Sequence, residues 1–471
     1  HEEVRNSPLM WFLSNNQFYD RVKTLEQGET WTVDLSVPKN NTYIANGFVS
    51  HNTRRGANMG ILRYDHPNIM EFIHCKQDNG FLENFNISVA IDAKFMDAVK
   101  NNQEYNLINP RKGEVAGTMN AKKVFDAMVA NAWKTGDPGY VVIDRINNTN
   151  SNPTPAQGQI ESTNPCVTGD TLVSTEYGLM RMEALVETYA EGGVRIMTDN
   201  RVPVQYKHAD GTVQVLQQSQ KGISADEITR AFSTGIKNVY KITTHAGYEL
   251  TATADHKVLA RYRDVVDWVS VEKLNPEMHT ILVQSGEGKF STKYQLPFEA
   301  HNQVVGKNGR RYALNLPTAW SKELGQVLGW LIGDGWLRQG DKNCRVGFTF
   351  GKEDTEVMEY VQPIINAYYG SQIKAVERRG GTHHLPYHSR YFVEFFQQLG
   401  VKAAYAKEKT VPETIFTAPK EAVIGFLQGL FSADGTVNLR ESNGAYYTRL
   451  TSVSKKLLQG VQLLLLNLGI Q

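Results

Sequence analysis

Alternating apolar and polar residues predict β-strands in two separate parts of the chain. Residues 32–37 alternate, residues 38–41 break the pattern, and residues 43–49 form a second strand-like run around an Asn-Gly turn signal. Many short strand-like runs, separated by Gly and Asp turns, then fill residues 166–300. The first region is therefore expected to be a short β-hairpin and the second an all-β domain.

Between these regions, in residues 53–165, the spacing of apolar residues is in some places typical of a helix and in others typical of a strand. A turn leading into a helix is expected at residues 65–73, a buried strand at residues 85–91 and an amphipathic helix at residues 122–133. Residues 138–144 predict a further turn and strand. Strands that alternate with helices favour a parallel α/β architecture.

Small residues line one face of two apolar helical runs in the last third of the chain. They recur every fourth position and are Gly325, Gly329 and Gly333 in the first run and Gly425, Gly429 and Ala433 in the second. Each interior glycine costs a helix about 1 kcal/mol relative to alanine, so a packing contact must compensate. We expect these two helices to pack almost backbone to backbone.

An aspartate follows each small-residue stripe directly, at Asp334 and Asp434, 100 residues apart. The dipeptide Val-Gln repeats at the same offset, at residues 361–362 and 461–462, so two pseudo-symmetric halves are expected, with both carboxylates converging. Paired carboxylates suit Mg²⁺ and phosphodiester hydrolysis. Residues 301–420 contain 16 Lys and Arg against 11 Asp and Glu, a net charge of +5 that is compatible with DNA binding.

Composition narrows the class of protein but not its function. The 471 residues suffice for about three domains, and 41% hydrophobic with 21% charged residues is typical of a globular protein. Three cysteines cannot form a disulfide framework, which favours a cytoplasmic location. No membrane partner is expected, because the apolar run at residues 461–470 is too short to span a bilayer. No signal peptide is evident. Because the chain begins with His1 rather than Met and stops at Gln471 in mid-pattern, we expect a fragment.

The tripeptide His51-Asn52-Thr53 has the chemistry of a self-cleaving peptide junction. The side-chain amide of Asn52 can attack its own carbonyl, His51 can supply a proton, and Thr53 offers a hydroxyl as acyl acceptor. Residues 31–53 resemble the C-terminal splicing blocks of inteins, which are self-excising protein elements. Asp34 stands at the position of the aspartate in that block.

A second group of residues has the chemistry of a peptide junction that is cleaved by attack of a side-chain thiol. Cys166 can attack the carbonyl of Pro165 and convert the amide into a thioester, a step that needs strain or protonation of the leaving nitrogen. The segments that contain Cys166 and the pair Thr253 and His256 resemble the N-terminal blocks of inteins. The resemblance implies that His256 protonates the Cys166 nitrogen, that Thr253 orients the bond, and that the fold is an all-β, Hint-type horseshoe.

Residues 53–165 resemble the large catalytic subunit of ribonucleotide reductase, whose fold is a ten-stranded α/β barrel. The similarity is most specific at residues 161–165, the run that precedes the radical cysteine of the family. It implies that Asn164 holds the substrate ribose, and the proline in this run favours the adenosylcobalamin-dependent class. The spliced host would then reduce a ribonucleotide with a thioredoxin-like thiol reductant. Cys166 is expected to be the intein nucleophile, because Val and Thr follow it where the family has Gly and Glu.

Residues 328–335 and 427–435 resemble the paired motifs of LAGLIDADG homing endonucleases. These enzymes fold as an α/β saddle over double-stranded DNA. The resemblance implies that Asp334 and Asp434 are catalytic metal ligands for Mg²⁺, and that Lys409 assists the attacking water.

Four domains are therefore predicted: the end of a first intein at 1–52, a reductase barrel segment at 53–165, the splicing domain of a second intein at 166–300, and a truncated endonuclease at 301–471. The leading interpretation is a fragment of an intein-bearing ribonucleoside reductase precursor with splicing and DNA endonuclease activity. A free-standing homing endonuclease with a residual autoprocessing domain, and an inert precursor piece, remain alternatives. The fragment alone is not expected to complete splicing, because each intein lacks one terminal block.

Overall fold

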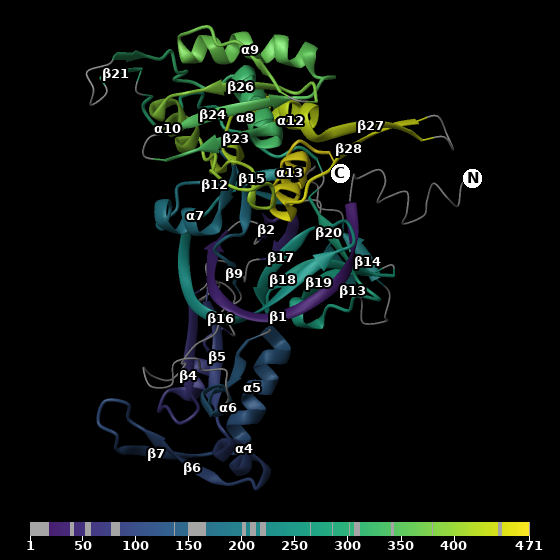
Figure 1. The fold of residues 1–471 in the computed structure, drawn as a ribbon. Helices are drawn as coiled ribbons and strands as arrows, with labels where there is room; N and C mark the ends of the chain where they lie inside the picture. Colours follow the sequence, from purple (N-terminus) through teal and green to yellow (C-terminus); the bar gives the residue numbers. More distant parts are fainter. Residues whose placement is uncertain are drawn as a thin grey trace. The chain divides into compact units, whose positions relative to one another are not determined.

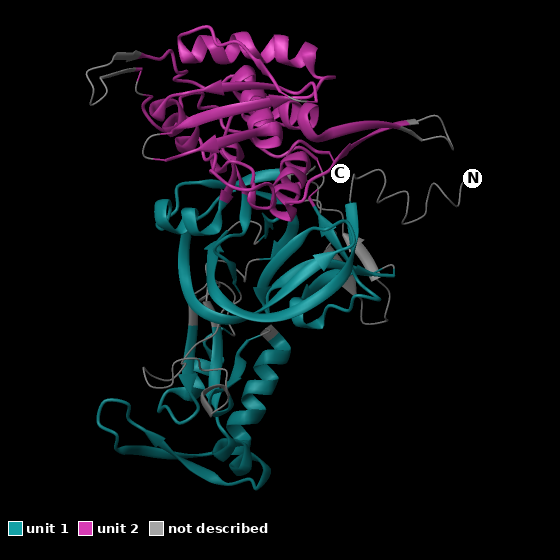
Figure 2. Cartoon of the chain, in the orientation of Figure 1, with its two compact units in different colours: residues 1–173, 181–283 teal, residues 174–180, 284–471 magenta. Residues whose placement is uncertain are grey.

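The computed structural model describes most of the chain. The described residues are 18–37, 42–51, 58–76, 85–135, 137–148, 166–199, 204–207, 213–216, 223–263, 265–284, 286–300, 302–305, 311–340, 343–378, 380–440 and 445–470. The chain divides into two compact units, residues 1–173 with 181–283 and residues 174–180 with 284–471 (Figure 2).

A 13-stranded sheet is the main structure of the first unit (Figure 1). Its strands are β1 (Phe18–Ser36), β2 (Thr42–Ala45), β3 (Phe48–His51), β9 (Val167–Thr168), β10 (Leu172–Thr175), β11 (Gly178–Arg181), β12 (Arg195–Asp199), β15 (Ile223–Glu227), β16 (Arg230–Thr244), β17 (Glu249–Thr253), β18 (Lys257–Tyr262), β19 (Val265–Ser270) and β20 (Thr280–Val283). The smaller elements nearby in sequence are α7 (Met182–Thr188), β13 (Val204–Lys207), β14 (Val213–Leu216) and the 3₁₀ turn η1 (Val271–Lys273).

Strand β1 is much longer than the sequence pattern predicted. It pairs antiparallel with β16 along most of its length, with β20 at its start and with β9 near its end. A strand of this length needs partners for its backbone N–H and C=O groups, and β16 supplies them from far downstream. Strands from the two segments that the sequence assigned to separate inteins, 18–51 and 167–283, therefore form one sheet.

The expected hairpin at residues 32–49 is confirmed only in part: β2 and β3 form a hairpin within residues 42–51, whereas residues 32–36 pair with β16 and β9. Asn46 and Gly47 connect β2 and β3 with φ angles of 47° and 84°, as a tight turn of the hairpin type requires. The Asn46 side chain also accepts a hydrogen bond from the Leu172 N–H at 2.7 Å and donates one to the Glu249 carbonyl at 3.0 Å. The turn thereby connects the hairpin to β10 and β17.

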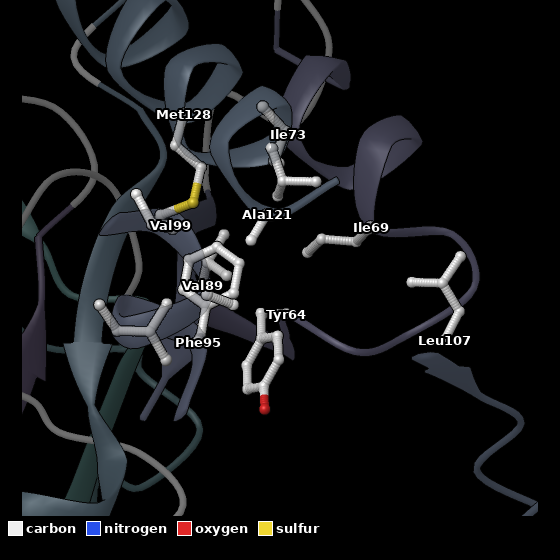
Figure 3. Packing of buried hydrophobic residues seen from close by; sticks show 12 residues of the cluster. Tyr64, Ile69, Ile73, Val89, Phe95, Val99, Leu107, Ala121 and Met128 are labelled. Carbon is white, nitrogen blue, oxygen red and sulfur yellow. The ribbon is translucent and has the colours of Figure 1, made fainter. Parts of the chain in front are cut away.

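Residues 58–148 form a small α/β structure with a parallel three-stranded sheet in the order β4-β5-β8. Its elements are β4 (Asn58–Arg63), α3 (Ile69–His74), β5 (Phe85–Ile91), α4 (Ala93–Lys100), β6 (Glu104–Ile108), β7 (Val115–Asn120), α5 (Ala121–Thr135), β8 (Gly139–Val142) and α6 (Ile143–Asn148). Side chains such as Ile69, Val89 and Phe95 pack together in its core (Figure 3). The parallel architecture and its main strands and helices agree with the sequence prediction. The antiparallel β6–β7 hairpin was not predicted.

The second unit contains two successive series of elements with the same order. The first is α8 (Lys322–Asp334), β23 (Gly335–Arg338), β24 (Arg345–Phe350) and α9 (Thr355–Tyr369), and the second is α12 (Lys420–Asp434), β27 (Gly435–Arg440), β28 (Ala445–Leu450) and α13 (Lys455–Asn467). The other elements are β21 (Gln303–Val305), β22 (Arg311–Ala313), β25 (Val376–Glu377), β26 (His383–Tyr387), α10 (Arg390–Gln398), the 3₁₀ turn η2 (Ala406–Glu408) and α11 (Glu413–Phe416). The near-constant offset confirms the predicted pseudo-symmetric halves.

Helices α8 and α12 pack backbone to backbone, as their small residues predicted. A Cβ atom added to Gly325 would overlap the carbonyl oxygen of Ala422, and one added to Gly429 would overlap that of Gln326. The close approach compensates for the low helix propensity of the glycines.

No helix in the described parts of the chain is both long and apolar enough to cross a membrane.

Candidate functional site

Cys166 is fully buried immediately before β9, and Thr253 at the end of β17 holds its backbone. The Cys166 N–H donates a hydrogen bond to Thr253 Oγ1 at 2.8 Å. The Thr253 N–H and hydroxyl both donate to the Cys166 carbonyl oxygen, at 2.8 and 3.3 Å. Thr253 therefore contacts the nitrogen of the peptide bond between residues 165 and 166 and fixes the orientation of Cys166.

The thiol of Cys166 lies near one acidic and one basic side chain, Asp34 and Lys237. Burial, and next the charge of Asp34, raise the pKa of Cys166 to about 11. Lys237 opposes this effect, and its Nζ donates a hydrogen bond to Cys166 Sγ at 3.3 Å. The thiol is therefore protonated at neutral pH, and Lys237 favours its thiolate form.

Asp34 is fully buried in β1, and Val33 beside it pairs with Val167 in β9. The Leu35 N–H donates to Asp34 Oδ1 at 2.9 Å, whereas Oδ2 has no hydrogen-bond partner among the described residues. Burial raises the pKa of this carboxyl to about 8. Asp34 is therefore mainly protonated at neutral pH and can donate a proton close to Cys166.

His256 is buried in the turn that follows Thr253, and its N–H donates to the Thr253 carbonyl at 3.1 Å. Burial, and next the charge of His51, lower the pKa of His256 to about 3. Its Nε2 has no hydrogen-bond partner among the described residues, and its ring centroid lies 6.2 Å from that of Tyr43. His256 is therefore neutral at pH 7, with one unused ring nitrogen.

His51 at the end of β3 pairs with Lys257, the residue directly after His256. Its ring packs edge-on against Trp268 with a centroid distance of 4.7 Å. Candidate residues of both junctions therefore meet at one sheet: His51 lies in β3, and His256 lies in the turn that leads into β18, the strand that pairs with β3. Asn52, Thr53 and Asn164, which the sequence also proposed, are outside the described residues.

The two aspartates of the second unit end the paired helices, Asp334 at α8 and Asp434 at α12. Burial, and next the charge of Asp434, raise the pKa of Asp334 to about 6; burial also raises the pKa of Asp434. A bound divalent cation would relieve this repulsion. No group of three or more His, Cys, Asp or Glu residues suited to a metal occurs in the described residues, so a cation here would also need water and phosphate oxygens, which Mg²⁺ commonly uses.

Lys409 lies near this pair, and its positive charge interacts with both aspartates. Its Nζ donates to the carbonyl oxygens of Gly333 at 2.6 Å and Gly335 at 3.1 Å. Burial lowers the pKa of Lys409, and both aspartates oppose that change. The ammonium therefore fixes the end of α8 next to Asp334.

Sequence reasoning missed Lys237 and Thr234, which both contact the Cys166 thiol. The register of β1 against β16 shifts after Thr32, beside Gly235 with φ of 82°. This bulge turns Thr234 toward Thr32, with 2.8 Å between their hydroxyl oxygens. A glycine inside a strand pattern is the one sequence signal that could have indicated such a bulge.

Comparison with known families supports two of the resemblances. The ribonucleotide reductase barrel domain matches residues 43–169, and a LAGLIDADG-like domain matches residues 421–471. A vitamin B12-dependent ribonucleoside-diphosphate reductase of Thermoplasma acidophilum is 49% identical over 114 residues, which are 24% of this chain and 15% of that protein. The chain therefore contains a segment similar to the ribonucleotide reductase barrel domain and a segment similar to a LAGLIDADG-like domain.

A second relative covers much more of this chain. The ribonucleoside-diphosphate reductase NrdEB subunit alpha of Bacillus subtilis is 24% identical over 463 residues, covering 88% of this chain and 38% of that protein. The chain thus spans well under half of these reductases. Among solved structures, variants of the homing endonuclease I-DmoI match 31% of this chain and 72% of their own, with 22% identity and a TM-score of 0.23.

In the described residues from 58 to 148, every buried side-chain polar atom has a hydrogen-bond partner. These residues therefore leave no orphaned buried donor or acceptor for a cofactor such as adenosylcobalamin.

Proposed function

We propose that this chain carries out the separate cleavage reactions of autocatalytic protein splicing at its two junctions, with residues 1–52 and 166–300 forming one Hint-type, horseshoe-shaped domain. The observation that carries this proposal is the Thr253 contact with the backbone N–H of Cys166, since that nitrogen must leave in the first step. In this proposal residues 53–165 are the host sequence, or extein, and residues 301–471 are the endonuclease.

The proposed first step moves the acyl group of Pro165 from nitrogen to sulfur. The Cys166 thiol loses its proton, Sγ bonds to the Pro165 carbonyl carbon, and the C–N bond breaks as the nitrogen takes up a proton. Thr253 holds the nitrogen. His256 is the proposed proton carrier: its neutral Nε2, which has no hydrogen-bond partner among the described residues, first takes up the proton that the Cys166 thiol loses and then passes it to the nitrogen. Asp34, protonated and buried nearby, holds a second proton that the reaction can use.

The proposed last step cleaves the other junction. The Asn52 side chain attacks its own carbonyl carbon to form a succinimide, and the amine of Thr53 leaves. His51 is the proposed proton donor to that amine. Its packing against Trp268 fixes the ring beside β18.

Thiol-induced cleavage tests the first step. Incubation of the purified chain with dithiothreitol should release a fragment of residues 1–165, measured by mass spectrometry, because an external thiol captures the thioester. Cys166→Ala should abolish the release. Cys75→Ser, a change at a cysteine in the reductase segment, should leave it unchanged. An equal yield from the Cys166 variant would exclude this mechanism.

We further propose that the second unit is a Mg²⁺-dependent, site-specific endonuclease for double-stranded DNA. The half-buried pair Asp334 and Asp434 supports this, because mutual repulsion favours a bound cation. With Mn²⁺ as a spectroscopic probe, Asp334→Asn or Asp434→Asn should weaken binding to the whole chain by about tenfold or more, while Glu394→Gln on the surface of α10 should not. Unchanged Mn²⁺ binding in both aspartate variants would remove the proposed metal site.

We also propose that the spliced host reduces ribonucleotides in the cytoplasm. The names of the relatives, which include vitamin B12-dependent ribonucleoside-diphosphate reductases, support adenosylcobalamin as its cofactor. Asn164 would hold the substrate ribose, and a thioredoxin-like protein would supply reducing thiols. Ribonucleotide reduction by the spliced host, but not by this chain, would be the expected result.

A further inference from the structure

Lys237 brings a second nucleophilic group to the site around Cys166. Its side chain extends from β16, and its Nζ lies 3.3 Å from Cys166 Sγ, a sulfur that is fully buried. Lysine usually keeps its ammonium group in water. An amine held against a buried sulfur can instead act as an acyl acceptor for a group that the sulfur carries.

The position of Lys237 matters most after the proposed first step at Cys166. The acyl group of residue 165 is then attached directly to Sγ, so its carbonyl carbon lies one covalent bond from that atom. Because Nζ already contacts Sγ, a small movement of the flexible lysine stem brings it to the separation of about 3–3.5 Å from which reacting atoms combine. This conclusion needs only the described positions of Lys237 and Cys166.

The surroundings of Cys166 favour this internal amine over nucleophiles in solution. The buried sulfur is shielded from water, whereas Lys237 is held beside it by the β-strand from which it extends. Well-oriented groups within one molecule react as if they were present at very high concentration. Acylation also removes the negative charge that a thiolate would offer, so the sulfur holds the Lys237 ammonium less strongly and Nζ can move toward the carbonyl carbon.

We propose that this chain transfers the acyl group of residue 165 from Cys166 to Lys237 and thereby forms an isopeptide bond. The inference rests on the proposed thioester at Cys166. Nζ first gives one proton to the α-amino group of Cys166 that the first step has freed. Nζ then bonds to the carbonyl carbon, the C–S bond breaks, and a second proton from Nζ restores the thiol. An amide replaces a thioester, and no further reagent is needed.

The product contains the same atoms as the starting chain but has a branched connectivity. Residues 1–165 are attached through their last carbonyl group to the side chain of Lys237, and Cys166 becomes a free amino end. Because an amide resists thiols that would cleave a thioester, the transfer fixes the reductase segment to β16.

A branched tryptic peptide is the direct test. After incubation of the full chain, trypsin should release residues 146–165 joined to Lys237 within residues 231–241, because trypsin does not cleave after an acylated lysine. A peptide that begins at Cys166 and ends at Arg181 should accompany it. The mass of the intact chain should not change, because no atom is lost.

Lys237→Arg separates the nucleophile from the charge. Arginine keeps a cationic N–H donor beside the sulfur but stays protonated, so it cannot take up the acyl group. The branched peptide should be lost completely, while dithiothreitol should still release residues 1–165. Lys241→Arg is the matched control on the same strand, where Lys241 forms an ion pair with Glu249, and it should keep the branched peptide at the yield of the parent chain.

The results separate this inference from the thioester proposal. Cys166-dependent release of residues 1–165 by dithiothreitol, with no branched peptide from the parent chain, would overturn the transfer to Lys237 and leave the thioester step intact. A branched peptide that persists in Cys166→Ala would also overturn the transfer, because the amide would then form without a thioester. Absence of both products from the parent chain would overturn both proposals.

Discussion

Gly329→Ala is the sharpest test of the contact between α8 and α12. The added Cβ would lie 2.6 Å from the Leu430 backbone nitrogen and 3.0 Å from the Gly429 carbonyl carbon, and it would overlap the Phe426 carbonyl oxygen. Overpacking costs about 1–3 kcal/mol, and rigid backbone atoms favour the upper end. Alanine returns about 1 kcal/mol of helix propensity. We therefore expect a net loss of about 2 kcal/mol in the stability of this helix pair.

Hydrogen exchange of the intact chain can measure this loss locally. Peptides from α8 and α12 should exchange faster by a factor of about thirty, since 1.4 kcal/mol corresponds to tenfold. Ser432→Ala, on the exposed side of α12, is the matched control and should change the free energy by no more than about 0.5 kcal/mol. Exchange in Gly329→Ala that is equal to or slower than in the parent chain would refute the backbone-to-backbone contact.

Three further changes test the electrostatics of the two sites. Lys237→Met should slow thiol-induced cleavage at neutral pH by about tenfold, because a loss of thiolate stabilisation equal to one pKa unit has that effect; Lys237→Arg should retain most activity and Lys241→Met, on the same strand, should be unaffected. Asp34 has a folded pKa of about 8, well above that of an unfolded carboxyl, so the folded chain keeps a proton that the unfolded chain loses and stability should fall as pH rises from about 4 to 8. Asp34→Asn should flatten that fall in denaturant titrations, and an unchanged pH dependence would contradict the buried neutral carboxyl. Asp434→Asn removes a nearby negative charge, so the pKa of Asp334 should drop below about 6 in a ¹³C NMR titration; no drop would show that the carboxylates do not interact.

Local signals in the sequence predicted much of the fold. The four-residue spacing of Gly325, Gly329 and Gly333 predicted a helix with one bare face, and residues 85–91 and 122–133 form the expected strand and helix. These features depend on neighbours within a few positions of the chain. They could therefore be read without knowledge of distant contacts.

Long-range pairing could not be read in the same way. Nothing in the residues of β1 specifies β16 as its partner, because each strand can satisfy its backbone groups with many others. Lys237 reaches Cys166 only through this pairing and the bulge beside Gly235. The shared sheet of the two splicing segments and the full set of groups around the thiol therefore required the structure.

The contact between α8 and α12 also limits how this chain can change over generations. Where two side chains meet, a larger residue on one helix can be matched by a smaller residue on the other. Opposite Gly325, Gly329, Gly425 and Gly429, however, lie peptide carbonyl oxygens, which every amino acid contributes alike. No substitution in the partner helix can create room for a larger residue, so a mutation at any of these four glycines cannot be compensated by a second mutation in the partner helix. The outer faces of the two halves can therefore vary in sequence, whereas these four positions should remain glycine.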